Sequence, residues 1–385
     1  MKEFMNKEVL EAQLSGIRSF NQIALGIKDS LLLTLGEPDF DTPQEICDEA
    51  KKALDDKYTH YAPTIGYNDL IAKISEYELK TNNVSYNSDE IIVTNGSTEA
   101  ITASLFSILN RGDEVIIPTP AFSLYESSLK LAGAKYVKLD TSVNNFQISK
   151  EMIDNVITEK TKCIVITSPN NPTGTIYTEE TLKNIHDAIK GKPIFIICDD
   201  CYESLIYQKR VPSFSTYQDI RKQIIVTKSF SKSYAMTGWR VGYLLADKEI
   251  ASEIVKYHQF MVTTVNSFIQ KACIKALDYN PLEMVNSYKE RRDYVYNRLL
   301  SMGLEVVKPE GAFYIFPKIA KYKMSSYDFC LKFLNEYHVC LIPGIYFDCE
   351  GYVRISYCVN KDVLVEALNR LEKYINDLEK NWLIN

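Results

Sequence analysis

A lysine among hydroxyl side chains stands in the segment SFSKSYAMTGWR, which runs from Ser229 to Arg240. Lys232 is flanked by Ser231 and Ser233 and precedes Arg240 by eight residues. An amine near a guanidinium and several hydroxyl donors suits a site that holds a phosphate beside a nucleophilic amine. In a chain with 44 Lys and Arg residues, one lysine is weak evidence alone. The segment therefore needs support from its neighbours in the fold.

A carboxylate in a second apolar segment provides such support. Asp199 directly follows the run Ile194–Cys198. A carboxylate that leaves a buried strand needs a cationic partner, because burying an unpaired charge is costly. Cys198 and Cys201 form a C-x-x-C pair, but the second pair of a zinc site is missing and the four histidines are scattered. We therefore expect no metal here and a cation beside Asp199.

Three more turns follow strand-like runs. In TNGSTEA a small-residue turn enters a helix, so free backbone N–H groups and the hydroxyls of Ser97 and Thr98 favour an anion. The turn PTPAF projects the ring of Phe122, and SPNNPTG presents the amide of Asn171. Helix capping, core packing and turn chemistry explain each turn taken singly. The common nucleotide-binding motifs G-x-x-x-x-G-K-[ST] and G-x-G-x-x-G do not occur.

Pyridoxal phosphate is the one cofactor that needs all of these groups at once. It requires a lysine for a Schiff base, a carboxylate for its pyridinium nitrogen, donors for its phenolate oxygen, a ring stack and a phosphate cup. Asp199 is the required carboxylate, and a protonated ring nitrogen would be the cationic partner that a buried Asp199 needs. The turns together predict a pyridoxal 5'-phosphate site, although no single turn does.

The elements that must position these turns alternate between strands and helices. Six apolar runs predict strands at Glu90–Thr94, Glu114–Pro118, Cys163–Thr167, Ile194–Cys198, Ile224–Thr227 and Val241–Leu245. Most are apolar throughout rather than alternating, which is typical of strands covered on both faces. Helical stretches such as Glu99–Leu109 and Glu179–Lys190 lie between them. We predict an α/β fold with a mainly parallel, doubly wound sheet in a large domain over 46–280.

The two ends of the chain predict a smaller α+β domain. The last third places a helical stretch at Tyr288–Leu304 before the short runs Gly311–Phe316, Val339–Pro343 and Tyr352–Tyr357, and a terminal helix starts at Asp362. The first 45 residues hold no sheet-forming set of their own, so we expect them to pack on this part. The predicted small domain comprises 1–45 and 281–385, and a cleft between the domains would hold a ligand.

Composition excludes several classes of protein. The 385 residues are 46% hydrophobic and 24% charged, with a net charge of −6, so no basic excess indicates nucleic acid or an anionic membrane. No apolar run approaches the roughly 18 residues of a membrane helix. The first residues are acidic and lack the apolar stretch of a secretory signal. Nine irregularly spaced cysteines favour free thiols, so we expect a cytoplasmic protein.

Over essentially its whole length, the sequence resembles the class I/II aminotransferases of the fold-type I pyridoxal-phosphate enzymes. The stretches that carry the resemblance are LGEPDF (35–40), HYAPTIGYNDL (60–70), TNGSTEA (94–100), GDEVIIPTPAFSLYE (112–126), SPNNPTG (168–174), CDDCYE (198–203), SFSKSYAMTGWRVGY (229–243), GAFYIFP (311–317) and GYVRISY (351–357). SPNNPTG and SFSKSYAMTGWRVGY are the most specific of them.

The resemblance implies a role for each site residue. Lys232 binds the cofactor covalently, Asp199 pairs with its ring nitrogen, and Tyr202 hydrogen-bonds its phenolate oxygen; these three are the predicted catalytic residues. The other predicted cofactor contacts stack on the ring, assist Tyr202 or surround the phosphate, and they are Phe122, Asn171, Gly96, Ser97, Thr98, Ser229, Ser231, Arg240 and, from a second subunit, Tyr61. The predicted contacts of the substrate α-carboxylate are Arg354, Gly36 and Asn171. Thr98 and Tyr125 are placed nearer the substrate side chain.

The implied activity is transfer of an amino group from an L-amino acid to a 2-oxo acid such as 2-oxoglutarate, in ping-pong fashion through pyridoxamine phosphate. Homodimers with shared active sites are expected. The tyrosine-rich stretches PTPAFSLYE and HYAPTIGY resemble aromatic or broad-specificity members, whereas SGIRSF (15–20) resembles N-acetyl-diaminopimelate aminotransferases. Aspartate aminotransferase ranks lower, because Thr98 stands where some dicarboxylate-specific relatives have lysine. A fold-type I β-lyase or decarboxylase, an effector sensor with an added DNA-binding domain, and a plain structural protein are less favoured alternatives.

Overall fold

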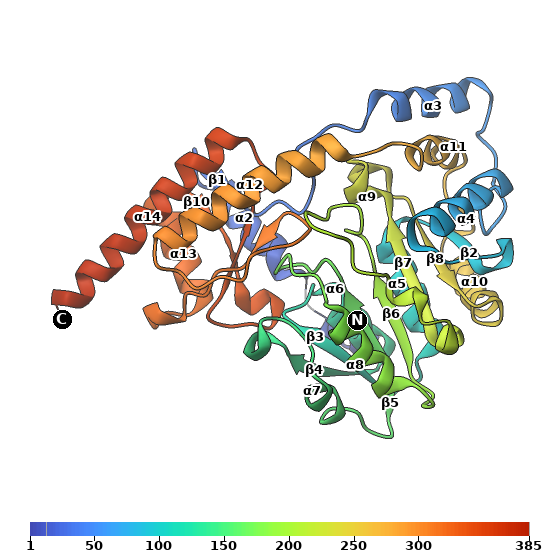
Figure 1. Ribbon diagram of the computed structural model, residues 1–385, viewed down its shortest axis with the longest axis horizontal. Helices are drawn as coiled ribbons and strands as arrows, with labels where there is room; N and C mark the ends of the chain where they lie inside the picture. Colours follow the sequence, from blue (N-terminus) through green and yellow to red (C-terminus); the bar gives the residue numbers. More distant parts are fainter. Residues whose placement is uncertain (13, 385) are drawn as a thin grey trace.

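Seven strands form the central sheet of the computed structural model, which describes residues 1–12 and 14–384 (Figure 1). The strands are β2 (Ile91–Thr94), β3 (Glu114–Thr119), β4 (Lys135–Asp140), β5 (Thr161–Thr167), β6 (Phe195–Asp199), β7 (Ile224–Ser229) and β8 (Gly242–Ala246). Their order is β2-β8-β7-β6-β5-β3-β4, and all neighbours are parallel except β8, which is antiparallel to β2 and β7. The predicted α/β class with a mainly parallel sheet is confirmed.

Helices cover both faces of this sheet, because alternate strand residues pack on opposite sides. Ile91 and Val93 belong to one apolar cluster, whereas Ile92 belongs to another. The helices on the first face are α3 (Gln44–Asp55), α4 (Asn68–Asn82), α8 (Glu179–Ile189) and α11 (Ser267–Ala276). Those on the second face are α5 (Gly96–Ile108), α6 (Leu124–Ala132) and α10 (Lys248–Val262). The strand faces are therefore buried, and chemistry is left to the loops at the strand ends.

One strand of the sheet escaped prediction. β4 is the edge strand beside β3, and most of its side chains are exposed or half-buried. Its sequence KYVKLD includes Lys135 and Lys138, and such charges are common on edge strands because they discourage pairing with another chain. A search for continuously apolar runs therefore passes over it.

A second unit combines the two ends of the chain. Its strands are β1 (Leu31–Leu32), β9 (Tyr314–Ile315), β10 (Val339–Cys340), β11 (Ile342–Pro343) and β12 (Val353–Ser356), and its main helices are α2 (Gly16–Leu25), α12 (Leu282–Ser301), α13 (Ser326–Tyr337) and α14 (Lys361–Ile384). β1 pairs with β10, so the N-terminal segment packs on the C-terminal part as expected. In Figure 1, α12 and α14 lie side by side.

The apolar clusters support the predicted division of the chain into domains. One cluster joins Phe20 and Leu33 to side chains from Met284 to Leu378, while the two clusters of the large sheet lie within residues 46–277. Side chains between Cys201 and Tyr207, in the loop after β6, also belong to the cluster of the small unit. We propose 46–280 and 1–45 with 281–385 as the two domains, joined through these loops.

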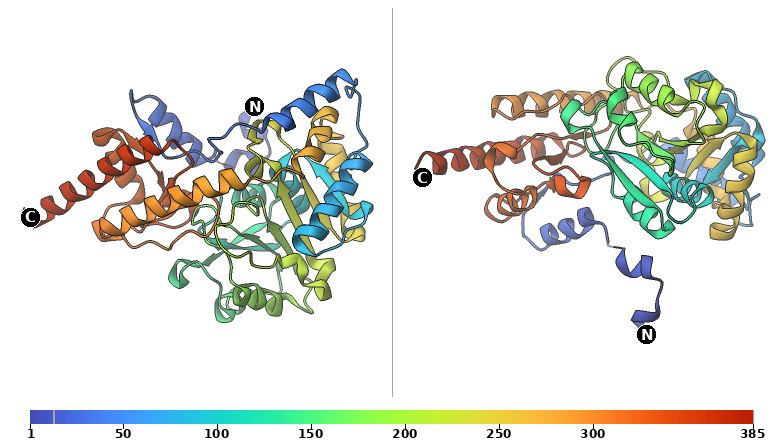
Figure 2. Two further views of the ribbon diagram at one scale, coloured as in Figure 1. Left: turned by 45° about the horizontal axis from the view of Figure 1, so that its top comes forward. Right: turned by 90° about the horizontal axis from the view of Figure 1, so that it is seen from below.

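The N-terminal residues before α2 lie at the periphery of the subunit, as the right-hand view of Figure 2 shows, and Glu8 forms an ion pair with Arg111 there. This segment contains α1 (Lys7–Glu11), and its apolar side chains Met1, Phe4 and Leu14 are exposed. The remaining short helices of the fold are α7 (Lys150–Asp154) and α9 (Phe230–Ser233). Within the described residues, no helix combines the length and apolar character that a membrane crossing demands.

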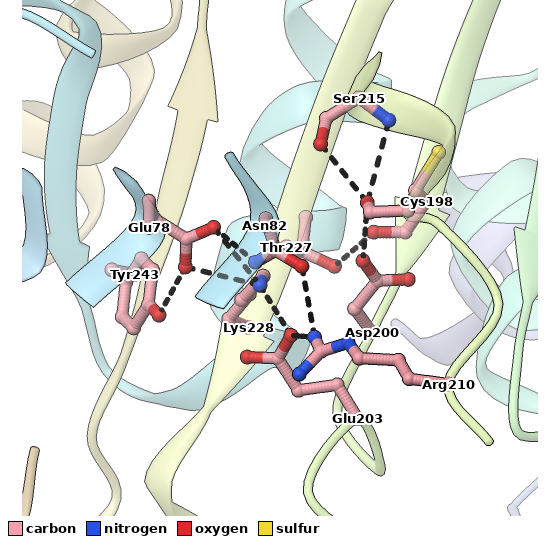
Figure 3. Close-up of polar contacts among 11 residues, drawn as sticks. Glu78, Asn82, Cys198, Asp200, Glu203, Arg210, Ser215, Thr227, Lys228 and Tyr243 are labelled. Atoms are coloured by element: carbon pink, nitrogen blue, oxygen red, sulfur yellow. Dashed lines mark hydrogen bonds and ion pairs between the residues drawn. The ribbon is translucent and has the colours of Figure 1, made fainter. Parts of the chain in front are cut away.

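A buried charge network lies where β6 and β7 end (Figure 3). Lys228 of β7 contacts Glu78 of α4 at 3.0 Å and Glu203 at 2.6 Å, and all three side chains are buried. Arg210 also contacts Glu203 at 2.5 Å. Burial acts to raise the pKa of Glu203, but Lys228 and Arg210 lower it overall. Nearby, burial raises the pKa of Asp200 to about 7.

This network fixes the strand ends that carry the predicted site. Lys228 precedes Lys232 by four residues, and Glu203 follows Asp199 by four. Tyr243 of β8 donates a further hydrogen bond to Glu78 at 2.8 Å. Because strands β7 and β8, helix α4 and the loop after β6 share one set of ion pairs and hydrogen bonds, their relative positions are tightly constrained.

A glycine connects the loop after β5 to the small unit. The carbonyl of Gly174 accepts hydrogen bonds from the N–H groups of Glu310 and Gly311 at 2.8 and 3.0 Å. Its φ is +69°, and a Cβ at this position would lie 2.6 Å from both Pro309 Cβ and the Tyr314 carbonyl oxygen. Only glycine fits this conformation and this space.

We predict that Gly174→Ala destabilises the protein more than Gly191→Ala does. Gly191 has a φ of +77°, but a Cβ added to it would meet no atom within 4 Å. The Gly191→Ala variant therefore measures only the free-energy cost of placing alanine at a positive φ. That cost is about 1–2 kcal/mol, and the collision at Gly174 should add about 1–3 kcal/mol. Denaturant unfolding of both variants measures the difference. Equal losses would contradict a tight junction at Gly174.

We predict that Lys228→Met lowers the free energy of unfolding by about 3–5 kcal/mol, or prevents folding, because Glu78 and Glu203 would lose a buried partner. The control is Lys222→Met, which removes an exposed lysine paired with Glu249 at 2.7 Å. Exposed pairs contribute about 1 kcal/mol or less. A Lys228→Met protein as stable as the control would show that the buried pairs contribute little.

Candidate active site

A cavity of about 610 Å³ opens at the carboxyl ends of the central strands, against the small unit. Parallel α/β sheets bind ligands at this edge. The predicted site residues that line it are Gly36, Ser97, Thr98, Phe122, Asn171, Asp199, Tyr202, Ser229, Ser231, Lys232, Arg240 and Arg354. The structure therefore brings together residues that are more than 300 positions apart in the sequence.

Lys232 lies on α9, the single helical turn that follows β7. The Ser229 hydroxyl caps this turn by accepting a hydrogen bond from the Ser231 N–H at 3.1 Å. The Lys232 amine is half-buried and donates a hydrogen bond to the carbonyl oxygen of Gly36. Burial lowers the pKa of this amine, and the nearby Arg240 acts in the same direction. A larger fraction of Lys232 is therefore in the neutral, nucleophilic form than for an exposed lysine.

Asp199 ends β6 and is 4% exposed. Its Oδ2 accepts a hydrogen bond from the Tyr125 hydroxyl at 2.7 Å, whereas its Oδ1 has no hydrogen-bond partner among the described residues. Burial raises the pKa of Asp199, while hydrogen bonds from Tyr125 and Cys201 oppose the rise. A cationic donor at Oδ1 would satisfy both the free oxygen and the buried charge.

Tyr125 has a different position from the one expected for it. It is 2% exposed, and its hydroxyl lies between Asp199 and Thr167, at 2.7 and 2.6 Å. Tyr125 therefore supports the carboxylate of Asp199, and its polar end does not read a substrate side chain. Sequence reasoning missed this role because the pairing spans 74 residues.

The start of α5 and Arg240 form a cup of donors. Gly96 begins α5 with a φ of +78°, and a Cβ on it would lie 2.7 Å from Arg240 Nη2. The guanidinium therefore occupies the space that the missing side chain leaves. Free N–H groups at the start of α5, the hydroxyls of Ser97 and Thr98, and the positive charge of Arg240 together favour a doubly charged anion such as a phosphate group.

Arg354 is a buried cation without an anion. It lies on β12 with 2% exposure and forms no ion pair within the described residues. Its Nη1 donates to Asn171 Oδ1 at 2.9 Å and its Nη2 to the carbonyl of Thr34 at 2.8 Å, but its Nε has no partner. Burial lowers the pKa of Arg354. A bound carboxylate would supply the missing anion and the acceptor for Nε.

Three further aromatic residues, Tyr202, Phe122 and Tyr314, line the cavity. The Tyr202 hydroxyl lies 2.9 Å from the Tyr314 hydroxyl, and Phe122 is half-buried with its ring in edge contact with Tyr125. Tyr314 also stacks under Arg354, with the guanidinium carbon 4.5 Å from the ring centre. Sequence reasoning did not single out Tyr314, although it lies in the GAFYIFP stretch.

Two predicted site residues are not part of the cavity lining: Gly96, which lies against Arg240, and Tyr61. Tyr61 is 87% exposed and lines another cavity, of about 540 Å³, with His60 and Phe268. Among the described residues, no group of three His, Cys, Asp or Glu side chains is arranged to hold a metal ion.

The free groups of the cavity fit pyridoxal phosphate. Asp199 Oδ1 matches a protonated ring nitrogen, the cup at Gly96 and Arg240 matches a phosphate, and the Lys232 amine matches an aldehyde. Arg354 remains for the carboxylate of a substrate. Asp199 Oδ1 and Arg354 Nε have no hydrogen-bond partner among the described residues, and the cofactor and the substrate would provide one for each.

Known proteins resemble the chain along nearly its full length. The family model for aminotransferase class I and II matches residues 28–371. A probable N-acetyl-LL-diaminopimelate aminotransferase from Bacillus subtilis is 42% identical over 381 residues, which are 97% of this chain and 96% of the relative.

Solved structures agree with this assignment. The aspartate aminotransferase of Thermotoga maritima is 34% identical with a TM-score of 0.93, and the match covers 97% of this chain and 100% of that one. The aromatic aminotransferase of Pyrococcus horikoshii is 37% identical with a TM-score of 0.88, over 94% and 99% of the two chains. The chain therefore belongs to the class I and II aminotransferases, the transferases that use pyridoxal phosphate to exchange amino groups between amino acids and 2-oxo acids.

Proposed function

We propose that this enzyme transfers the amino group of an aromatic or of varied L-amino acids to a 2-oxo acid such as 2-oxoglutarate, with Lys232, Asp199 and Tyr202 as catalytic residues. One observation carries the proposal: a single cavity holds a half-buried lysine, a buried carboxylate with a free oxygen and a buried arginine without an anion. Each has the charge that one part of the cofactor or the substrate requires.

The residue roles follow from these contacts. Bound pyridoxal phosphate supplies an aldehyde that condenses with amines and a ring that accepts electrons. Asp199 holds a proton on the ring nitrogen, Tyr202 and Asn171 hold the phenolate oxygen, and Phe122 covers the ring. Ser97, Thr98, Ser229, Ser231, Arg240 and the backbone of Gly96 hold the phosphate. Lys232 removes the proton from the substrate Cα, which its lowered pKa favours.

The same geometry orients the substrate. The guanidinium of Arg354 and the backbone of Gly36 hold the α-carboxylate, and Asn171 fixes the guanidinium through its hydrogen bond at 2.9 Å. Because the Lys232 amine contacts the carbonyl of Gly36, the proton-transfer group and the carboxylate site are neighbours. Holding the carboxylate beside the amine presents the Cα proton to Lys232.

N-acetyl-diaminopimelate is a second candidate substrate, and aspartate is a third. The relative from Bacillus subtilis, at 42% identity, supports the first of these alternatives, and the relative from Thermotoga maritima supports the second. Both substrates carry a carboxylate at the end remote from the reacting amine, unlike aromatic amino acids. The choice between the candidates therefore depends on what the outer part of the cavity recognises.

We also propose a cytoplasmic homodimer with shared active sites, acting on small molecules and not on nucleic acid or membranes. Tyr61 would then complete the phosphate cup of the other subunit, which accounts for its 87% exposure in the single chain. Phe260 is 89% exposed, and Met1 and Phe4 at the periphery of the subunit (Figure 2) are exposed as well, so all three have apolar surface to bury. Nine free cysteines support a reducing compartment.

We predict that Lys232→Ala abolishes the covalent link to the cofactor and nearly all turnover. Borohydride reduction followed by peptide mass spectrometry should place the cofactor on Lys232 in the wild type. Lys222→Met, which alters an exposed lysine, should keep both the label and the activity. Recovery of the label on another lysine would overturn the assignment.

We predict that Arg354→Lys reduces kcat/KM for phenylalanine, tyrosine, aspartate and glutamate by a similar factor, because all four carry the α-carboxylate. Lysine offers a point charge in place of a planar fork, so a loss of about 1.5–3 kcal/mol is expected. If kcat/KM fell only for the two dicarboxylic donors, Arg354 would bind the substrate side chain and not the α-carboxylate.

A further inference from the structure

A buried histidine on α10 faces a hydrogen-bond acceptor with each of its two ring nitrogens. His258 is fully buried, its Nδ1 lies 2.5 Å from Glu99 Oε1, and its Nε2 lies 2.8 Å from the carbonyl oxygen of Thr64. A neutral imidazole carries one N–H group and can donate to only one of these acceptors. Because both contacts need a proton, His258 is an imidazolium that forms a buried ion pair with the carboxylate of Glu99.

Glu99 connects this histidine to the cup of donors at the start of α5. It lies in the first turn of α5, and its Oε2 accepts a hydrogen bond from the N–H of Asn95, the residue that precedes Gly96. Asn95 makes no side-chain capping bond to the helix, so Glu99 holds the backbone where the chain turns from β2 into α5. The groups assigned to the phosphate follow directly, at Gly96, Ser97 and Thr98.

Thr64 connects the histidine to the segment that carries Tyr61. This segment, residues 60–67, is called the arm below. The carbonyl of Ile65 accepts a hydrogen bond from the N–H of Val93 in β2 at 3.0 Å, so the arm is anchored beside the strand that leads into α5. Tyr61 lies three residues before Thr64 and is 87% exposed. In the proposed homodimer, Tyr61 contacts the phosphate of the other subunit.

We propose that His258 is a positioning residue for the cofactor phosphate, which holds the start of α5 through Nδ1 and the arm through Nε2. This inference rests on the proposed function, because it takes the cup to bind the phosphate and Tyr61 to act in the neighbouring site. His258 is not among the residues that line the cavity, so it acts through Glu99 and Thr64. Because one rigid ring makes both contacts, the cup of one active site and the arm of the next are held at a fixed distance from each other.

Two substitutions separate the two contacts. Asparagine places its amide near the position of Nδ1 and is too short to reach Thr64, so His258→Asn keeps a donor for Glu99 alone. Glutamine places its amide near the position of Nε2, so His258→Gln keeps a donor for Thr64 and leaves Glu99 without its cation. The control is His186→Gln, because His186 of α8 is also buried and contacts an aspartate with each ring nitrogen, but does not line the cavity.

The measurement compares a ligand that carries the phosphate with one that lacks it. The cofactor is removed from each full-length protein by dialysis against hydroxylamine, and absorbance titrations give the dissociation constants of pyridoxal phosphate and pyridoxal. Both His258 variants should weaken pyridoxal phosphate by about tenfold, the effect of losing one charged hydrogen bond, and change pyridoxal by less than about twofold. His186→Gln should resemble the wild type with both ligands. Equal weakening of the two ligands, or no weakening of either, would overturn the inference.

A double-mutant cycle tests the contact with the arm. Tyr61→Phe alone should weaken pyridoxal phosphate by about tenfold. Added to His258→Asn it should cost less than about twofold more, because the arm is already released, whereas added to His258→Gln it should cost its full factor. Additive losses in the His258→Asn protein would overturn the inference alone. A wild type that binds pyridoxal as tightly as pyridoxal phosphate would overturn the phosphate cup of the proposed function together with this inference.

Discussion

The guanidinium of Arg354 is a buried cation whose hydrogen bonds join three separate parts of the chain. Arg354 itself belongs to β12 of the small unit, Asn171 to the loop after β5, and Thr34 to the N-terminal segment. A buried charge without a counter-ion is costly, and two neutral acceptors replace only part of its lost hydration. The two units are therefore held together around a cation that still lacks an anion. In the proposed function a substrate carboxylate supplies the missing anion, and its binding would then be linked to the arrangement of the units.

A second charge cluster, around Lys228 of β7, differs because its charges are paired. Lys228 is deeply buried, as Arg354 is, but it contacts two carboxylates, and Glu203 is shared with Arg210. Its charges and donors are used within the protein, so nothing remains for a ligand. The two clusters therefore have different roles. The ion pairs of Lys228 hold the end of β7 and the loop after β6 in place, whereas Asp199 and Arg354 each keep a polar atom without a partner among the described residues.

Much of the fold could be predicted from the sequence because the strand pattern is strong. Runs such as Cys163–Thr167 are apolar throughout, and their order along the chain restricts the topology to a parallel α/β sheet. The residues after each run could be grouped because strand ends meet at one edge. β4 could not be predicted in this way, because lysines interrupt its apolar residues and most of its side chains are not buried, as is common at a sheet edge.

What the sequence could not reveal are pairings between distant residues with no local signature. Tyr125 supports Asp199, and Arg354 stacks on Tyr314, but neither contact follows from spacing along the chain. His258 lies in a helix whose sequence is explained by packing, so the contacts of its two ring nitrogens became visible only in three dimensions. Spacing alone could not connect it to partners 159 and 194 positions away.

Unsatisfied polar atoms distinguish Asp199 and Arg354 from the buried ion pairs of Lys228. Lys228 and Asp199 are both buried and both lie at strand ends, so burial does not distinguish them. The difference is that Lys228 has ion-pair partners, whereas Asp199 Oδ1 and Arg354 Nε have none among the described residues. A folded protein retains such costly groups where a ligand completes them, because the same groups that oppose stability in the free protein supply binding energy in the complex. Asp199 and Arg354 line one cavity, where the first has the charge to bind a cationic group and the second the charge to bind an anion. That placement of opposite charges within one cavity is what allows a cofactor ring and an amino acid to be held together next to Lys232.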